Sequence, residues 1–242
     1  MGNLYLGEFI GTMILVLLGD GVVANTLLEK TKGKGVGANW VLITTGWGFG
    51  VVFGVTTAIL AGSPYGFINP AVAIPFAVIG RIGWAEAIGC TIAEILGGFV
   101  GAILVYLAYY SHFAETEDPA LKLAVFSTAP QIRNLGLNFI TEAIGTFMLV
   151  FGVLAIGDGL EPPLYWVPFI VGVLVWSIGI SLGGPTGYAI NPARDLGPRI
   201  AHAILPIPGK GSSDWEYGLT VPIFGPIVGG IIGAILAVAV AA

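Results

Sequence analysis

One tripeptide occurs twice in this chain, as Asn69-Pro70-Ala71 and as Asn191-Pro192-Ala193. Each copy opens a short apolar segment, the first ending near Ile79 and the second near Ala203. Asparagine is a good helix N-cap, and proline suits the first helical position because its missing N–H would have no partner there. Both segments are about half as long as the ~20 residues that an apolar helix needs to cross a bilayer. We therefore predict two half-length membrane helices.

The composition predicts a membrane protein. Of the 242 residues, 56% are hydrophobic and 10% are charged, and the mean hydropathy is +0.92. A soluble domain usually carries about a quarter charged residues, so this chain lacks the polar side chains to cover a water-facing surface. The charged residues lie scattered in loops and form no basic face, which argues against a nucleic-acid partner. The exterior is expected to face a lipid bilayer.

Six further apolar stretches are long enough for a full membrane span. They cover about residues 4–28, 39–61, 82–110, 138–160, 164–183 and 219–241. We predict one membrane domain over residues 1–242, with a first repeat at about 4–110, a polar linker at about 111–137 and a second repeat at about 138–241. In the linker, the acidic run Glu115-Thr116-Glu117-Asp118 is expected to be a solvated loop.

The two halves of the chain resemble each other. A first-span pattern is echoed in the fourth span: Glu8-Phe9-Ile10-Gly11-Thr12 with Gly19-Asp20-Gly21, and Glu142-Ala143-Ile144-Gly145-Thr146 with Gly157-Asp158-Gly159. Each half has three spans, an odd number, so the second half must enter the membrane from the opposite side as an inverted repeat. The predicted fold is all-α, with six transmembrane helices and two half-helices whose N-termini meet near the midplane. Their dipoles, each equivalent to about half an elementary charge, would repel cations and protons there.

This pattern resembles the major intrinsic proteins, the aquaporin and glycerol-facilitator family, over nearly the whole chain. Its most specific part is the run 187–199, which reads GYAINPARDLGPR. Asp195, directly after the arginine of this run, is similar to the bacterial glycerol-facilitator branch, whereas water-selective members usually have a small residue there. The resemblance implies a multi-pass channel of the cell membrane, a homotetramer with one pore in each chain, and cytoplasmic termini.

The resemblance also implies which residues form the narrowest point of the pore. Arg194 matches the filter arginine, and Tyr188 matches an aromatic that is usually phenylalanine in glycerol facilitators. Gly179 falls where water-specific channels place a histidine, and its missing side chain is expected to leave room for a carbon backbone. Trp47 matches the aromatic on the second span. Together these four residues resemble a polyol filter.

Asn69 and Asn191 are expected to offer side-chain N–H donors at the pore midplane, next to a ladder of backbone carbonyls from the loops before them. Non-helical backbone is tolerated at membrane depth where it is buried or lines a wet cavity. A role as helix caps alone is the alternative, and the two roles are compatible.

Three acidic residues are expected to support the pore. Glu8 and Glu142 recur at equivalent positions of the two halves and are predicted to hold the pore loops through backbone N–H bonds, with a proton relay as the alternative. Asp195 is expected to be a structural partner of a nearby donor such as Arg199. Arg194 could itself brace the loop by an ion pair instead of lining the pore.

The sequence departs from the family pattern at two places. Trp47 lies two residues further from Asn69 than the family spacing, so an insertion falls between them. If the insertion lies inside the helix, Phe49 could replace Trp47 at the pore, and Trp47 could face lipid. In addition, Phe67 stands where the family often has a histidine.

We expect passive diffusion of small uncharged solutes: glycerol and similar polyols, with water, undissociated lactic acid and hydrogen peroxide as further solutes. A water-selective channel is the main alternative and is opposed by Gly179 and Asp195. An ion-coupled secondary transporter shares the inverted-repeat design. No cofactor, metal site or catalytic residue is expected, because the sequence has no nucleophile–base pair, and His112 and His202 have no cysteine or carboxylate at ligand spacing.

The loop charges conflict with the topology that the resemblance implies. Cytoplasmic termini would leave only Arg81 inside among the basic loop residues, against the positive-inside rule. Six basic residues would lie outside: Lys30, Lys32, Lys34, Lys122, Arg133 and Lys210. We follow the family topology, because the inverted architecture makes the charge signal ambiguous.

Overall fold

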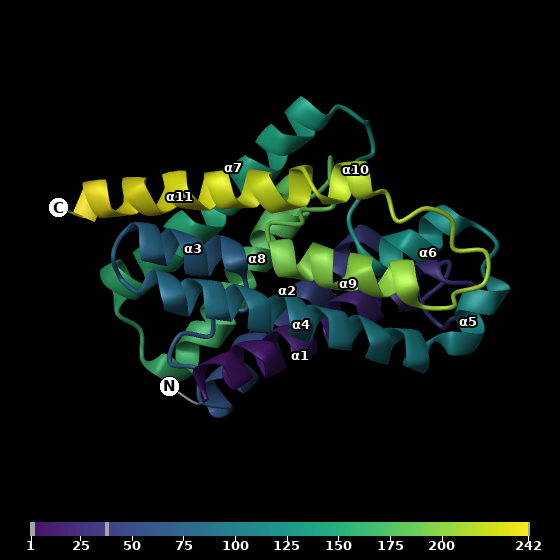
Figure 1. Ribbon diagram of the computed structural model, residues 1–242, viewed down its shortest axis with the longest axis horizontal. Coiled ribbons are helices and arrows are strands. Elements are labelled where there is room, and N and C mark those ends of the chain that lie inside the picture. Colours follow the sequence, from purple (N-terminus) through teal and green to yellow (C-terminus); the bar gives the residue numbers. More distant parts are fainter. Residues whose placement is uncertain (1–2, 37–38, 242) are drawn as a thin grey trace.

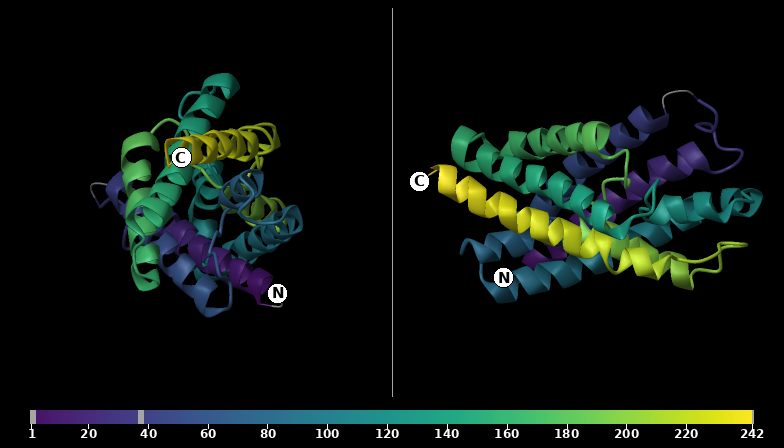
Figure 2. Two further views of the ribbon diagram at one scale, coloured as in Figure 1. Left: turned by 90° about the vertical axis from the view of Figure 1, so that its left-hand side faces the viewer. Right: turned by 90° about the horizontal axis from the view of Figure 1, so that it is seen from above.

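The computed structural model describes residues 3–36 and 39–241, and its regular elements there are all helical. Six long helices run along the molecule with moderate tilts (Figures 1 and 2). They are α1 (Leu4–Leu27), α2 (Asn39–Leu60), α4 (Trp84–Ala108), α7 (Leu135–Leu154), α8 (Val167–Leu182) and α11 (Val221–Ala241). With short helical extensions, six described segments are long and apolar enough to cross a membrane, which confirms the predicted spans.

Seven shorter elements complete the chain. They are α3 (Pro70–Val78), α5 (Tyr110–Glu115), α6 (Pro119–Phe126), the π-helical η1 (Ala155–Leu160), the 3-10 turn η2 (Leu164–Trp166), α9 (Pro192–Ile204) and α10 (Trp215–Gly218). The predicted half-helices correspond to α3 and α9. The two ends of the chain lie at one end of the bundle, and α5 and α6 lie at the other (Figure 1).

The linker between the halves has a short helix on each side of its acidic run, and the run itself is an exposed loop apart from one buried residue. The two helices are α5 and α6, and Thr116 in the acidic run is only 1% exposed. The Thr116 hydroxyl accepts a hydrogen bond of 2.9 Å from the backbone N–H of Glu29 and donates one of 2.8 Å to the carbonyl of His112. The threonine therefore ties the linker to the end of α1, while its acidic neighbours remain at the surface.

Glycines let the long helices approach closely at matching places in the two halves. A Cβ atom added at Gly97 of α4 would lie 2.2 Å from the carbonyl oxygen of Phe9 in α1. A Cβ added at Gly229 of α11 would lie 1.9 Å from the carbonyl oxygen of Ala143 in α7. Small residues at such crossings bring backbones together, which is how membrane helices pack without a hydrophobic driving force.

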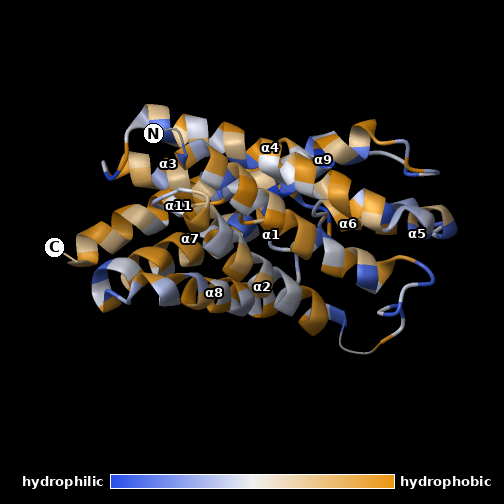
Figure 3. Ribbon diagram, turned by 90° about the horizontal axis from the view of Figure 1, so that it is seen from below, coloured by the Kyte–Doolittle hydropathy of each residue, from blue (hydrophilic) through white to orange (hydrophobic). Residues whose placement is uncertain are grey.

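The long helices consist mainly of hydrophobic residues, and hydrophilic residues gather toward the two ends of the bundle (Figure 3). Large exposed side chains on the outer helices include Phe53, Ile92, Ile144, Phe224 and Ile232, each more than half exposed. Such a continuous apolar belt would be costly in water and is suited to lipid.

Candidate functional site

The asparagines of the two Asn-Pro-Ala segments cap the half-helices α3 and α9, as predicted. The Asn69 side-chain oxygen accepts a hydrogen bond of 2.8 Å from the backbone N–H of Ala71. The Asn191 side-chain oxygen accepts bonds of 3.0 Å from Ala193 and 3.2 Å from Arg194. These bonds satisfy N–H groups that the first turn of a helix leaves without partners.

The same two asparagines also join the halves of the chain. The Asn69 amide donates a 2.8 Å hydrogen bond to the carbonyl of Ile190, and the Asn191 amide donates one of 2.8 Å to the carbonyl of Ile68. The half-helix starts therefore meet, each beside the other's loop. Because a carboxamide has two N–H groups, each asparagine keeps a second donor after this bond is made.

The first pore loop is held by Glu8. Its carboxylate is fully buried and accepts hydrogen bonds from Ser63 Oγ at 2.5 Å, from the Phe67 backbone N–H at 3.0 Å and from the Ile68 backbone N–H at 2.6 Å. Ile68 has a φ of +46°, which is strained for a β-branched residue. Such strain persists where the surroundings fix the backbone, and here the carboxylate does so.

The second pore loop repeats this arrangement with Glu142. Its carboxylate accepts hydrogen bonds of 3.0 Å from the backbone N–H of Ala189 and 2.8 Å from that of Ile190. Tyr188 and Ile190 have φ values of +40° and +43°. With these left-handed residues on either side of Ala189, the backbone N–H groups of Ala189 and Ile190 both point to the buried Glu142 carboxylate.

A cavity of about 290 Å³ runs past both half-helix starts. Its lining includes Trp47, Tyr188 and Arg194 and the loop residues up to Asn69 and Asn191. Arg81, Ile156 and Gly157 also line it. Apolar residues of α2, α7 and α8 complete the wall: Val51, Val55, Leu149, Val153, Val171 and Val175. An apolar wall with a few converging polar groups is typical of a small-molecule site.

Trp47 and Arg194 lie face to face at the cavity. The guanidinium carbon of Arg194 is 3.9 Å from the centroid of the Trp47 ring, a close cation–π contact. The ring packs on α1, where a Cβ at Gly19 would lie 2.3 Å from it. Phe49 is instead 51% exposed on the outside of α2. Trp47, and not Phe49, is therefore the α2 aromatic that lines the cavity.

Gly179 affects the shape of the cavity indirectly, by making space for the Tyr188 ring. It is not among the lining residues, because the Tyr188 ring fills the space beside it: a Cβ at Gly179 would lie 2.7 Å from the ring carbon Cζ. Trp40 supports the ring edge-on at 5.8 Å between centroids and donates a 3.1 Å hydrogen bond to the Gly179 carbonyl. The missing side chain therefore makes room for the tyrosine, not directly for a solute.

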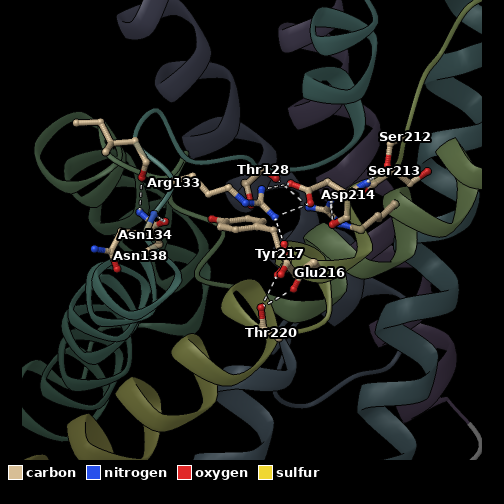
Figure 4. A network of polar contacts seen from close by, with 12 residues as sticks. Thr128, Arg133, Asn134, Asn138, Ser212, Ser213, Asp214, Glu216, Tyr217 and Thr220 are labelled. Atoms are coloured by element: carbon tan, nitrogen blue, oxygen red, sulfur yellow. Dashed lines mark hydrogen bonds and ion pairs between the residues drawn. The ribbon is translucent and has the colours of Figure 1, made fainter.

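Asp195 and Arg199 form a buried ion pair behind Arg194. The Arg199 Nε atom is 2.7 Å from Asp195 Oδ1, and both side chains are fully buried. Asp195 also accepts bonds from the Thr128 backbone N–H at 2.8 Å and hydroxyl at 2.7 Å, and Arg199 donates to the carbonyls of Thr128 and Ser213. Figure 4 shows Thr128 of the linker together with polar residues at and just before α10, among them Ser213, Asp214 and Tyr217. This network fixes the linker over the second half-helix.

Arg81, which lines the cavity, forms an ion pair with Asp158. Arg81 follows α3, and Asp158 lies in the π-helical η1. The guanidinium donates two hydrogen bonds to the carboxylate, and both side chains are about 40% exposed. The pair therefore bridges one half of the chain to the other.

The structure adds site residues that sequence reasoning missed. Glu94 of α4 is fully buried beside the Glu8 carboxylate and the backbone N–H of Asn69. A lone carboxylate inside an apolar span signals function, and Ala93-Glu94-Ile95 carries this signal in the sequence. Phe67, which the sequence marks as a departure from the family pattern, lines the cavity, with its ring stacked on Tyr65 at 4.7 Å between centroids.

Comparisons with known proteins agree with this geometry. Residues 3–237 match the Major intrinsic protein family, MIP. The chain is 58% identical over 231 residues to a probable glycerol uptake facilitator protein of Thermotoga maritima, covering 93% of this chain and 94% of that one. It is 43% identical over 229 residues to a D/L-lactic acid transporter of Lactiplantibacillus plantarum, covering 91% and 90%.

Among solved structures, the aquaglyceroporin from Plasmodium falciparum matches with a TM-score of 0.85 and 28% identity, over 97% of this chain and 94% of that one. Two half-helices that meet at a lined cavity, in a chain with these relatives, leave one assignment. The chain belongs to the Major intrinsic protein family.

Proposed function

We propose that this chain is a passive channel for small uncharged solutes, with glycerol and similar polyols as its main substrates. The observation that carries the proposal is the cavity that joins the two asparagines to the Trp47–Arg194 pair. One wall is apolar and the polar groups are few, which suits a molecule with a C–H side and a hydroxyl side.

In this proposal Trp47, Tyr188 and Arg194 form the selectivity filter. The two aromatic rings contact the carbon side of a polyol, while the guanidinium donates to its hydroxyls. Gly179 acts by letting the Tyr188 ring lie back against α8. Each hydrogen bond with water that the solute loses in the filter is replaced by one with the protein. Passage is therefore diffusion and involves no chemical step.

The midplane would exclude ions. Asn69 and Asn191 lie at the positive ends of two facing helix dipoles, each equivalent to about half an elementary charge. A cation or proton is repelled there, whereas a neutral solute meets the remaining amide donors of the asparagines. Glu8 and Glu142 hold the loops that present the backbone carbonyls, and Asp195 holds the linker above them.

The relatives support this solute class. They are named for glycerol uptake and, in one case, for D/L-lactic acid. Lactic acid in its undissociated form has a similar size and carries a hydroxyl next to a carboxyl group, so the same filter can serve it. We therefore include undissociated lactic acid, together with water and hydrogen peroxide, among the solutes.

Stopped-flow light scattering on proteoliposomes tests the function. We expect glycerol permeability well above that of empty vesicles and unchanged when a sodium or proton gradient is imposed. Flux that requires a gradient would point to an ion-coupled transporter, and flux of water without glycerol would point to a water-selective channel. Either result would overturn the proposal.

We also propose a homotetramer in which each chain contains its own pore, as the family resemblance implies. The position of the cavity between the two halves of one chain is in keeping with a separate pore in each chain. Native mass spectrometry of the purified protein tests the oligomeric state. For the orientation we propose cytoplasmic termini. Lys32 is exposed and Cys90 is buried, so a Lys32→Cys variant gives a clean labelling site. Labelling by an impermeant reagent in intact cells supports this topology, and protection contradicts it.

A further inference from the structure

The first half of the chain lines the cavity with a second group of aromatic residues and an arginine. Its members are Tyr65, Phe67, Phe76 and Arg81, and all four belong to the cavity wall. The Phe67 ring stacks on Tyr65 at 4.7 Å between centroids and meets Phe76 edge-on at 5.1 Å. The guanidinium carbon of Arg81 lies 5.8 Å from the centroid of the Phe76 ring, within the range of a cation–π contact. We call these four residues the first-half cluster.

The first-half cluster lies at a different level of the bundle from the Trp47–Arg194 pair. The backbone N–H of Phe67 donates to Glu8 of α1, whereas the Trp47 ring packs against Gly19 of the same helix. Glu8 and Gly19 are about 16 Å apart along the axis of α1, at 1.5 Å per residue. A solute that crosses the cavity therefore meets the two groups one after the other.

The Arg81 guanidinium has more hydrogen-bond donors than its ion pair uses. Within residues 3–36 and 39–241 it donates to Asp158 alone, with one N–H from each terminal nitrogen. Since a guanidinium carries five N–H groups, the others are free to bind water or a solute. The side chain is 39% exposed, so these donors are accessible.

Asp158 makes this arginine suitable for an uncharged solute. It neutralises the guanidinium through a two-bond ion pair, and it belongs to η1 in the other half of the chain. Its neighbours Ile156 and Gly157 also line the cavity. A bidentate pair of this kind fixes the direction of the guanidinium as well as its charge. The remaining donors are therefore held in place without a net charge that would attract anions.

We propose that the first-half cluster is a second solute site of the channel, and that it recognises the same class of small polyols as the filter. The rings of Phe67 and Phe76 contact the C–H side of the solute, while the free N–H groups of Arg81 donate to its hydroxyls. The filter uses the same two kinds of group, with a ring and a guanidinium 3.9 Å apart. The proposal rests on the proposed function, because it takes the cavity as the solute path.

The ratio of glycerol to water permeability tests the second site. Both permeabilities are measured by stopped-flow light scattering on proteoliposomes of the full-length protein, of Arg81→Gln and of Phe67→Leu. A water molecule has no C–H side, so the loss of a polyol site affects glycerol more than water. We expect each variant to lower the glycerol-to-water ratio about threefold to tenfold, which corresponds to the net contribution of one hydrogen bond.

Two matched controls separate a solute contact from general damage to the protein. Arg133→Gln breaks a two-bond ion pair with Asp214, and Arg133 is not among the residues that line the cavity. Phe53→Leu replaces a ring that is 52% exposed on the outside of α2. Both variants should keep the glycerol-to-water ratio of the unmodified protein. A fall in either control as large as in its cavity counterpart would overturn the proposal.

Asp158→Asn distinguishes a solute contact from a bridge between the halves. This substitution removes the ion pair and keeps the Arg81 donors. The melting temperatures of Asp158→Asn and Arg81→Gln should fall by similar small amounts, because exposed ion pairs contribute little to stability. The glycerol-to-water ratio should fall in Arg81→Gln and stay close to that of the unmodified protein in Asp158→Asn. An equal fall in both variants would mean that Arg81 acts only by joining the halves, and it would overturn the second site.

Failure of the second site and failure of the proposed function give different results. Normal glycerol flux in the unmodified protein, with an unchanged glycerol-to-water ratio in Arg81→Gln and Phe67→Leu, would refute the second site alone. Absence of glycerol flux in the unmodified protein would refute the proposed function and the second site with it. If Phe67→Leu yields no folded protein, Arg81→Gln decides, since the Arg81 side chain is exposed and its replacement leaves the core unchanged.

Discussion

The Tyr188 ring occupies the space that a side chain at Gly179 would need, with only 2.7 Å between a Cβ there and the ring carbon Cζ. A Gly179→Ala substitution must therefore push the ring toward the cavity that it lines. Overpacking of this kind costs about 1–3 kcal/mol. We expect glycerol permeability to fall about tenfold, measured by stopped-flow light scattering.

Gly184→Ala is the matched control. A Cβ at Gly184 would meet no atom within 4 Å, and Gly184 lies in the turn directly after α8, the helix that contains Gly179. Its glycerol permeability should equal that of the unmodified protein. Equal permeability for Gly179→Ala and Gly184→Ala would show that the contact between ring and glycine does not control the passage.

The Tyr188 hydroxyl is buried and has no hydrogen-bond partner among the described residues. Tyr188→Phe removes this group and keeps the ring that fills the space at Gly179. We expect an unchanged or slightly higher melting temperature and faster passage of a longer polyol such as erythritol relative to glycerol. A lower erythritol-to-glycerol ratio would mean that the hydroxyl binds the solute instead of narrowing the passage.

Glu142 supports a loop whose backbone is strained at Ile190. Glu142→Gln replaces one carboxylate oxygen by an amide donor, so one of the two backbone N–H groups loses its acceptor. Hydrogen bonds to charged groups contribute about 1.5–3 kcal/mol. We expect a clearly lower melting temperature and at least about tenfold less glycerol flux. Thr141→Val on the exposed face of the same helix is the control, and a similar loss there would point to a general effect on α7.

The Arg133–Asp214 ion pair lies outside the membrane-spanning segments. It makes the stability of the folded protein depend on pH. Hydrogen bonding to the Arg133 guanidinium holds the pKa of Asp214 below its ordinary value. Its contribution to stability is therefore present above the ordinary aspartate pKa of about 4 and is lost as pH falls through the lowered value. Arg133→Gln should reduce the drop in melting temperature between pH 6 and pH 3. Lys32→Gln should leave the drop unchanged. An unchanged drop in Arg133→Gln would contradict the linkage.

Most of the architecture could be predicted from the sequence, because membrane spans and helix caps are local signals. The spans and both half-helices lie within a few residues of their predicted ends. Trp47 could be matched only by resemblance, since the two-residue insertion left Phe49 as an alternative. In the structure the Trp47 ring packs against Gly19 of α1, and this contact decides which aromatic of α2 faces the cavity.

Other features depend on contacts between distant segments. The bonds from Asn69 to Ile190 and from Asn191 to Ile68 require both loops to be in place at once. The burial of Thr116 depends on the end of α1, and the role of Gly179 depends on where the Tyr188 ring turns. A single sequence does not contain these distances, so it predicts the contacts of the amide donors and of the glycine with the solute but not their contacts with the opposite loop and the tyrosine ring.

One measurement tests most directly whether solutes pass through this cavity. Val175 lines it one helical turn before Gly179, and the native Cys90 is buried. In proteoliposomes of Val175→Cys, methyl methanethiosulfonate should abolish most of the glycerol flux, whereas equally labelled Ile232→Cys on the lipid face should conduct as before. Full glycerol flux through completely modified Val175→Cys would contradict the proposed route.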